Sequence, residues 1–252
     1  MFSRLRASAG TRDWLAVGID FAVVVIGVFL GIQAANWNNA RLDRQREHRA
    51  LELLIEEAQN NIAYARLILY RADLMQKDRI AAAAMLESRA ATGGDPVRGL
   101  AAMAVFRDMT PIHAAYDELT WSGDINLIQS HEVRNALALY NGVVVFHDRM
   151  RSEYVDRAPD IMALASSYMK VRFDSSSPIG YTAIVDWTAA GRDSLLVNSV
   201  NRVMGAQHEF NERRRIILDH AEKLCAALAN ELKKKCQAPD WVAEERREAG
   251  PG

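Results

Sequence analysis

The chain is poor in the residues that interrupt helices and in those that favour sheets. Of its 252 residues, 14 are Gly, 6 are Pro and only 8% are aromatic, whereas half are hydrophobic. Gly and Pro together make up about 8% of the chain, against about 12% in average proteins. Its two cysteines exclude a scaffold of many disulfides and a four-cysteine zinc site. The composition therefore favours an all-α protein with enough material for one or two domains.

Neither sign of charge is in excess, and the common catalytic motifs are missing. Lys and Arg number 31 and Asp and Glu number 32, so the basic surface typical of nucleic-acid binders is not expected. The chain lacks the P-loop, the dinucleotide-binding loop, the nucleophile elbow and the HExxH zinc motif. A Glu-x-x-His pair, which a di-iron bundle needs, occurs at none of its six histidines. We therefore predict no enzyme activity, catalytic residue, cofactor or metal, and no nucleic-acid partner.

One long apolar run follows a basic N-terminal tail, residues 1–13. Residues 14–35 carry a single charge, Asp20, and as a helix they would cross a hydrocarbon core of about 30 Å. Trp14 and Trp37 would then lie about 35 Å apart, one in each interface of the bilayer. This pattern predicts a transmembrane helix. A cleaved signal peptide is the alternative, although Gln33 lies two places before a cleavage site after Ala35, where a small residue is usual.

The small residues of this segment share a helix face with its carboxylate. Gly27, Gly31 and Ala35 follow the spacing that lets two membrane helices approach closely, and Asp20 projects in the same direction. Two explanations stay open. Either this face packs against a second membrane helix, or Asp20 reaches the headgroups and the glycines pack nothing. We expect self-association, or docking to a membrane protein, through this face.

Arginines flank the apolar run on both sides in similar numbers, so they are a weak signal for its orientation in the membrane. Three arginines precede it, and four, Arg41, Arg44, Arg46 and Arg49, follow it. Because a long C-terminal domain crosses a membrane largely regardless of its charge, we expect that domain in the periplasm. The expected location is thus the bacterial inner membrane, with the chain crossing it once.

Residues 36–236 show the patterning of a helical stalk and bundle. Neither Gly nor Pro occurs between 36 and 89, and apolar residues recur there in alternating steps of four and three, which predicts one long helix continuous with the membrane segment. Further helices are predicted over 97–121, interrupted near Pro111, over 131–172, with a kink before Pro159, and from an N-cap at Asp193 onward. Helices with apolar faces predict an antiparallel bundle. Residues 237–252 are predicted to be a frayed polar tail.

Two segments carry a resemblance to a known family. The first leads through the apolar run into the triplet Asn36, Trp37 and Asn38, and the second, residues 116–140, reads YDELTWSGDINLIQSHEVRNALALY. Together they resemble an uncharacterised family of bacterial single-span membrane proteins, which shares the Asn-Trp-Asn triplet and a Tyr-x-Glu-Leu and Ser-Gly-x-Ile-x-Leu-Ile block. The resemblance covers about 45 residues and implies location and architecture, with no activity.

Residues 116–140 predict a corner between two helices. Gly123 is expected at φ > 0 after the first helix, with Ser130 as N-cap of the second. Glu118 and Arg134 would satisfy backbone groups of the turn or pair with each other. We interpret the corner as structural, and Glu118 is its one carboxylate that merits a functional test.

Three weaker signals leave alternatives to a pure scaffold. His147, His208 and His220 would form a metal site if their helices faced one another. Gln207 and Arg214 interrupt the last helix's apolar stripe, either as a specificity layer or as the rim of a ligand cavity. Cys225 and Cys236 lie too far apart on a straight helix to bridge, so a disulfide requires a turn near Lys233. The leading hypothesis is a membrane-anchored interaction or scaffold protein; the alternatives are a ligand-sensing bundle and, more weakly, a metal-dependent activity.

Overall fold

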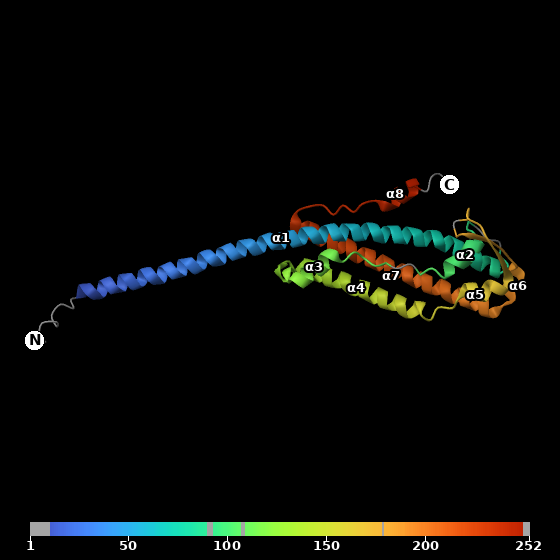
Figure 1. Ribbon diagram of the computed structural model, residues 1–252, viewed down its shortest axis with the longest axis horizontal. Coiled ribbons are helices and arrows are strands. Elements are labelled where there is room, and N and C mark those ends of the chain that lie inside the picture. Colours follow the sequence, from blue (N-terminus) through green and yellow to red (C-terminus); the bar gives the residue numbers. More distant parts are fainter. Residues whose placement is uncertain (1–10, 90–92, 107–108, 178, 249–252) are drawn as a thin grey trace, which may run out of the picture.

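The fold is a helical bundle built on one very long helix. The computed structural model describes residues 11–89, 93–106, 109–177 and 179–248. Three long helices dominate it (Figure 1): α1 (Thr11–Leu86), α4 (His131–Val155) and α7 (Ser194–Leu232). The shorter elements are α2 (Pro96–Met103), α3 (Ala114–Ser122), η1 (Asp124–Leu127), α5 (Ile161–Ala165), η2 (Ser166–Tyr168), α6 (Trp187–Arg192) and α8 (Trp241–Glu248). The predicted all-α class is confirmed.

Helix α1 combines an exposed apolar half with a half that builds the bundle. Its first half extends away from the rest of the molecule (Figure 1) and is long and apolar enough to cross a membrane. From Ala50 onward, α1 buries the predicted stripe of apolar side chains, which includes Leu51, Ile62 and Leu69. The predicted continuity of the apolar segment with the stalk is therefore confirmed.

Helix α7 runs antiparallel to α1 along the whole bundle. Ion pairs join Arg66 to Glu222 at 2.7 Å and Glu52 to Lys234 at 2.6 Å, so the end of α7 lies beside the start of the bundle half of α1. Helix α4 packs on α7 in turn. One hydrophobic core cluster joins these three helices around Ile62, Tyr140 and Leu228. A second cluster, around Leu86, Leu100 and Leu196, fills the far end of the bundle.

The structure corrects the prediction of a helix over 131–172. Helix α4 ends at Val155, because the residue that precedes Pro159 is disfavoured in helical conformation. The chain then forms an antiparallel hairpin from β1 (Met169–Phe173) and β2 (Tyr181–Val185), with Val171 opposite Ala183. Its strands are rich in β-branched and aromatic residues, which suit extended backbone.

The predicted start of the last helix is confirmed. Asp193 is the N-cap of α7, and its carboxylate accepts hydrogen bonds from the N–H groups of Leu195 (2.9 Å) and Leu196 (3.2 Å). The same carboxylate also accepts a hydrogen bond from the Tyr168 hydroxyl at 2.9 Å. Asp193 therefore ties the segment between the hairpin and α4 to the start of α7.

Candidate ligand-binding cleft

At the far end of the bundle, α2 lies directly on the backbone of α1. A Cβ atom at Gly99 would stand 2.1 Å from the carbonyl oxygen of Asp78, and one at Gly94 would stand 2.5 Å from that of Lys77. Both distances are impossible for a side chain, so glycine is required at these two positions. The close approach brings the polar residues of α1 against both ends of α2.

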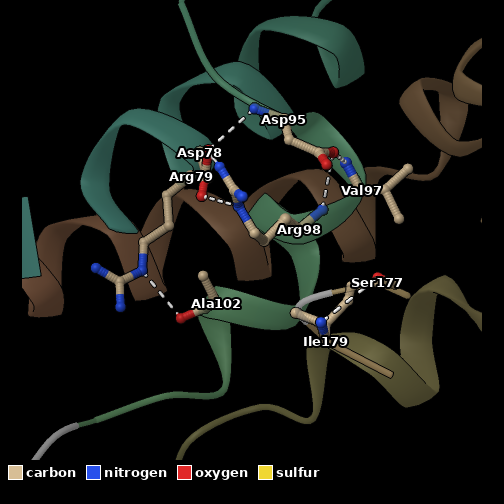
Figure 2. A network of polar contacts seen from close by, with 8 residues as sticks. All are labelled: Asp78, Arg79, Asp95, Val97, Arg98, Ala102, Ser177 and Ile179. Carbon is tan, nitrogen blue, oxygen red and sulfur yellow. Dashed lines mark hydrogen bonds and ion pairs between the residues drawn. The ribbon is translucent and has the colours of Figure 1, made fainter. Parts of the chain in front are cut away.

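Asp78 binds the N-terminal end of α2. Its carboxylate accepts hydrogen bonds from the Asp95 N–H (3.0 Å) and from Arg98, through Nε (2.5 Å) and Nη2 (3.0 Å), as Figure 2 shows. Burial by itself would raise the pKa of Asp78. The hydrogen bonds from Arg98 and Asp95 and the charges of Arg98 and Arg79 outweigh burial, and they hold that pKa below its usual value.

Arg79 binds the C-terminal end of α2. Its Nε donates to the carbonyl oxygen of Ala102 at 3.0 Å (Figure 2), and its Nη2 donates to that of Val105 at 3.1 Å. Gln207 of α7 donates to the same Val105 oxygen, also at 3.1 Å. Arg79 and Gln207 are each only 1% exposed. A buried polar layer therefore joins α1, α7 and the chain that leaves α2.

Beside this network lies a cleft of about 460 Å³, a size typical of small-molecule sites. Its walls come from α1, α2, α8 and the turn of the hairpin, and their residues are Arg71, Leu74, Met75, Lys77, Asp78, Gly93, Arg98, Ala101, Ala102, Val105, Ile179 and Glu245. The lining combines apolar side chains with three cations and two carboxylates. The described residues of this wall include no Ser, Thr, Cys, His or Tyr.

The charges in the cleft are unequally matched. Asp78 pairs with Arg98, and Arg71 pairs with Glu245, with Nε 3.0 and 2.8 Å from the two carboxylate oxygens and Nη2 2.7 Å from the nearer one. The fifth charged group, Lys77, is exposed and makes no ion pair within the described part of the chain. The cleft therefore has one surplus positive charge.

Glu245 comes from a segment that the sequence predicted to be frayed. Residues 241–248 instead form α8, which lies along α1, with the Arg246 guanidinium 4.8 Å from the centre of the Tyr70 ring. The polar composition of this segment gave no sign of the helix, because residues far away in the sequence hold α8 in place. The chain reverses at Lys233, whose φ is 53°, and Cys225 and Cys236 form a disulfide with their Cα atoms 5.7 Å apart. This is the turn that a bridge between the two cysteines requires.

The corner formed by α3, η1 and the start of α4 is built largely as predicted. Gly123 has a φ of 81°, and Ser130 caps α4 by accepting a hydrogen bond from Val133. Arg134 donates to the carbonyl oxygen of Ile128 at 3.0 Å. Glu118 is exposed, and no hydrogen bond or ion pair joins it to Arg134 in the described residues. Of the two proposed roles for this pair, the structure therefore has Arg134 satisfying the turn backbone.

Polar side chains of α1 hold this corner in place. The amide of Asn61 exchanges two hydrogen bonds with the backbone of Ile112, at 2.7 and 2.9 Å. Glu57 accepts a hydrogen bond from the Ala115 N–H at 2.6 Å, at the start of α3, where His113 offers no side-chain cap. Burial raises the pKa of Glu57 despite these backbone hydrogen bonds. The corner is thus fastened to the stalk by buried or half-buried polar groups.

The weaker sequence signals fall into two groups. Gln207 and Arg214 are each 1% exposed and belong to the polar interior, where Arg214 donates to Asn211 at 2.6 Å; neither lines the cleft described above. His147 is buried against the Phe210 ring, whereas His208 is exposed. Within the described chain, neither these nor other His, Cys, Asp or Glu side chains form a group of three that could hold a metal.

The predicted membrane residues are free of contacts with the bundle. Asp20, Gly27, Gly31 and Ala35 are exposed, and a Cβ atom at either glycine would meet nothing within 4 Å. Trp37 is exposed as well. The side chain of Trp14 and residues 1–10 lie outside what the structure describes. Packing of this face against another helix therefore stays a prediction.

Comparisons of the chain with family models, with curated proteins and with solved structures found no match. The cleft itself was not predicted from the sequence, because its residues belong to no motif and come from distant segments. One signal was present. Continuing the apolar stripe of α1 beyond Ala72 in steps of four and three reaches Gln76 and Arg79, two polar residues at positions that face the interior.

Proposed function

We propose that this protein is a single-pass protein of the bacterial inner membrane whose helical domain is a non-catalytic interaction module, with the distal cleft as its contact site. The observation that carries the proposal is the continuity of α1. One unbroken helix contains the apolar segment and, later, Arg71, Lys77 and Asp78 of the cleft. From Trp37 to Lys77 it rises about 60 Å, so the cleft would be held well away from the bilayer.

The interior of the bundle supports an interaction role over catalysis. Its long helices are joined by hydrophobic clusters, and Gln207 and Arg214 are buried between the helices. The cleft offers charges and apolar surface, and its described lining residues include no Ser, Thr, Cys, His or Tyr. These features are typical of a site that binds a partner or ligand and releases it unchanged.

The disulfide supports a periplasmic domain. Bridges between cysteines persist in oxidising compartments and are rare in the cytosol, so the pairing of Cys225 with Cys236 favours the far side of the inner membrane. This agrees with the orientation expected for a long C-terminal domain. The partner would then be another component of the cell envelope, and the Gly27 and Gly31 face would serve self-association or contact with a membrane protein.

Ligand sensing is the second candidate function, and the position of the cleft favours it. A ligand there would touch Arg71, Leu74 and Lys77, which belong to the same helix as the apolar segment. Binding at one end of α1 would therefore act on the element that enters the bilayer. A sensor of this kind requires a separate membrane partner to carry the output.

The proposal is tested on the full chain expressed in a bacterial host. After alkaline carbonate extraction of the membranes, the protein should stay in the pellet. A chain recovered in the supernatant would contradict the membrane anchor. A matched variant, Val24→Arg with Val25→Arg, places two charges in the apolar segment and should move protein into the supernatant, because each costs about 2.5 to 3.5 kcal/mol in the bilayer centre.

Orientation is tested in intact spheroplasts with a membrane-impermeant maleimide. The reagent should label the exposed Cys236 only after treatment with an impermeant reductant, because the bridge leaves no free thiol. The variant Cys236→Ser should lose this requirement once the domain is unfolded with urea, which exposes the buried Cys225. Labelling that occurs only after lysis would place the domain in the cytoplasm and contradict the periplasmic proposal.

A further inference from the structure

Helix α8 is attached to the bundle by few contacts, and one of them lies in the cleft. Its residues belong to neither hydrophobic core cluster. The ion pair of Glu245 with Arg71 and the stacking of Arg246 on Tyr70 join α8 to α1. Both contacts involve partly exposed groups, where single interactions of this kind are weak. The disulfide fixes the chain at Cys236, five residues before α8 begins, so α8 is able to leave while its tether stays in place.

The carboxylate of Glu245 lies in the cleft at the edge of an apolar surface. The Arg71 Nε donates to both carboxylate oxygens of Glu245, and Nη2 lies 2.7 Å from the nearer oxygen, so two nitrogens of the guanidinium hold this carboxylate as they would hold that of a ligand. Leu74, Ala101 and Ile179 line the same cleft, and Lys77 adds a positive charge without an ion pair among the described residues. Arg71 and the surplus positive charge favour an anionic ligand. The apolar wall favours a ligand that also has an apolar body.

We propose that the cleft binds a small amphipathic carboxylate, an apolar body that carries one carboxylate group, and that Glu245 of α8 occupies the place of that carboxylate when the cleft is empty. The ligand carboxylate would pair with Arg71 in competition with Glu245, and its body would lie against Leu74, Ala101 and Ile179. Binding would then release α8. This inference rests on the proposed function, because it names the chemistry of the ligand at its contact site.

The probe is 4-phenylbutyrate, and its neutral amide, 4-phenylbutyramide, is the control ligand. Binding is measured by saturation-transfer NMR and calorimetry on the full chain in lipid nanodiscs. Glu245→Gln should bind the acid about tenfold more tightly than the unaltered chain, since one charge-assisted hydrogen-bonding competitor is weakened. The amide should bind weakly and equally to both. Arg71→Gln should remove the advantage of the acid over the amide.

The chain offers a matched control in Arg66 and Glu222, an ion pair with the same 2.7 Å separation that lies outside the cleft. Glu222→Gln should leave the affinity for the acid unchanged. A second readout is tryptic cleavage after Arg246 in α8, which the acid should accelerate in the unaltered chain and the amide should not. The proposal is overturned if acid and amide bind alike, if Glu245→Gln and Glu222→Gln behave alike, or if the acid binds none of these proteins.

These measurements separate the cleft from the membrane anchor. If the chain were extracted by carbonate, the proposed location would fail while the binding of the acid could still be measured on the same protein. If the acid did not bind but the chain stayed in the membrane pellet, the ligand assignment alone would fail.

Discussion

Asp78 and Arg79 are consecutive residues of α1, and their side chains bind opposite ends of α2. The Asp78 carboxylate accepts the N–H of Asp95, before the helix, and the Arg79 guanidinium donates to the carbonyl of Ala102, in its last turn. The negative group thus lies at the positive end of the helix dipole and the positive group at its negative end. Because an eight-residue helix is marginal by itself, these contacts with α1 position it and the cleft beside it.

Replacing Arg79 should therefore destabilise the bundle strongly. We expect Arg79→Met to lower the free energy of unfolding by about 2 to 4 kcal/mol, because it removes a buried charged donor from the carbonyls of Ala102 and Val105, and a hydrogen bond to a charged group contributes about 1.5 to 3 kcal/mol. Arg66→Met, which removes an exposed ion pair with Glu222, should cost only about 0 to 1 kcal/mol. Urea unfolding in mild detergent, followed by circular dichroism, measures both. Equal losses would contradict the role given to Arg79.

Two glycine-to-alanine substitutions should have opposite signs. Gly99→Ala places a methyl group against the Asp78 carbonyl, and overpacking of this kind costs about 1 to 3 kcal/mol. Gly142, in the middle of α4, has open space where a Cβ atom would lie. Gly142→Ala should stabilise the protein by about 0.5 to 1 kcal/mol, because alanine loses less backbone entropy in a helix. Thermal unfolding should show the two melting temperatures moving in opposite directions.

The half-buried Glu57 should make stability depend on pH. Burial raises its pKa in the folded state above the ordinary value of a glutamate. Its contribution to stability is therefore fully present below the pKa of the unfolded chain and is lost as the pH rises through the folded pKa. Glu57→Gln keeps an acceptor for the Ala115 N–H and removes the charge, so at pH 7 it should be at least as stable as the unaltered chain. Glu56→Gln, at the exposed neighbouring position, is the control, and a destabilised Glu57→Gln at pH 7 would contradict this account.

The features that were predictable from the sequence depend on signals within a few residues. The unbroken α1, the caps at Ser130 and Asp193 and the positive φ of Gly123 are each specified by residues close to the element they define. The same local reasoning predicted a helix from His131 to residue 172, whereas α4 ends at Val155. The short strands that replaced its end are stabilised by pairing across a turn, as Val171 does with Ala183, and no helical period reveals such a partner.

The cleft was beyond prediction for a related reason. Its two arginines, Arg71 and Arg98, belong to α1 and α2, and their carboxylate partners lie 174 and 20 residues away along the chain. Helix α8 depends in addition on the reversal at Lys233 and on the bridge to Cys225, which the sequence left open. The sequence did contain one sign: Arg79 places a charge in the apolar stripe of α1, at a position that faces the interior. A charged residue at such a position requires a partner, and here the partners are the carbonyls of Ala102, in the last turn of α2, and of Val105, just after it.

The last prediction concerns self-association through the helix face that carries Gly27 and Gly31. Neither glycine meets another group within the chain, so a larger side chain there should leave the bundle unchanged. If two membrane helices pack through this face, Gly31→Leu should separate their backbones and shift the protein in detergent from dimer to monomer. Val25→Leu adds a methylene on the opposite face and is the control. Multi-angle light scattering measures the mass of each variant. If Gly31→Leu and Val25→Leu have the same mass as the unaltered chain, the glycine face does not mediate self-association.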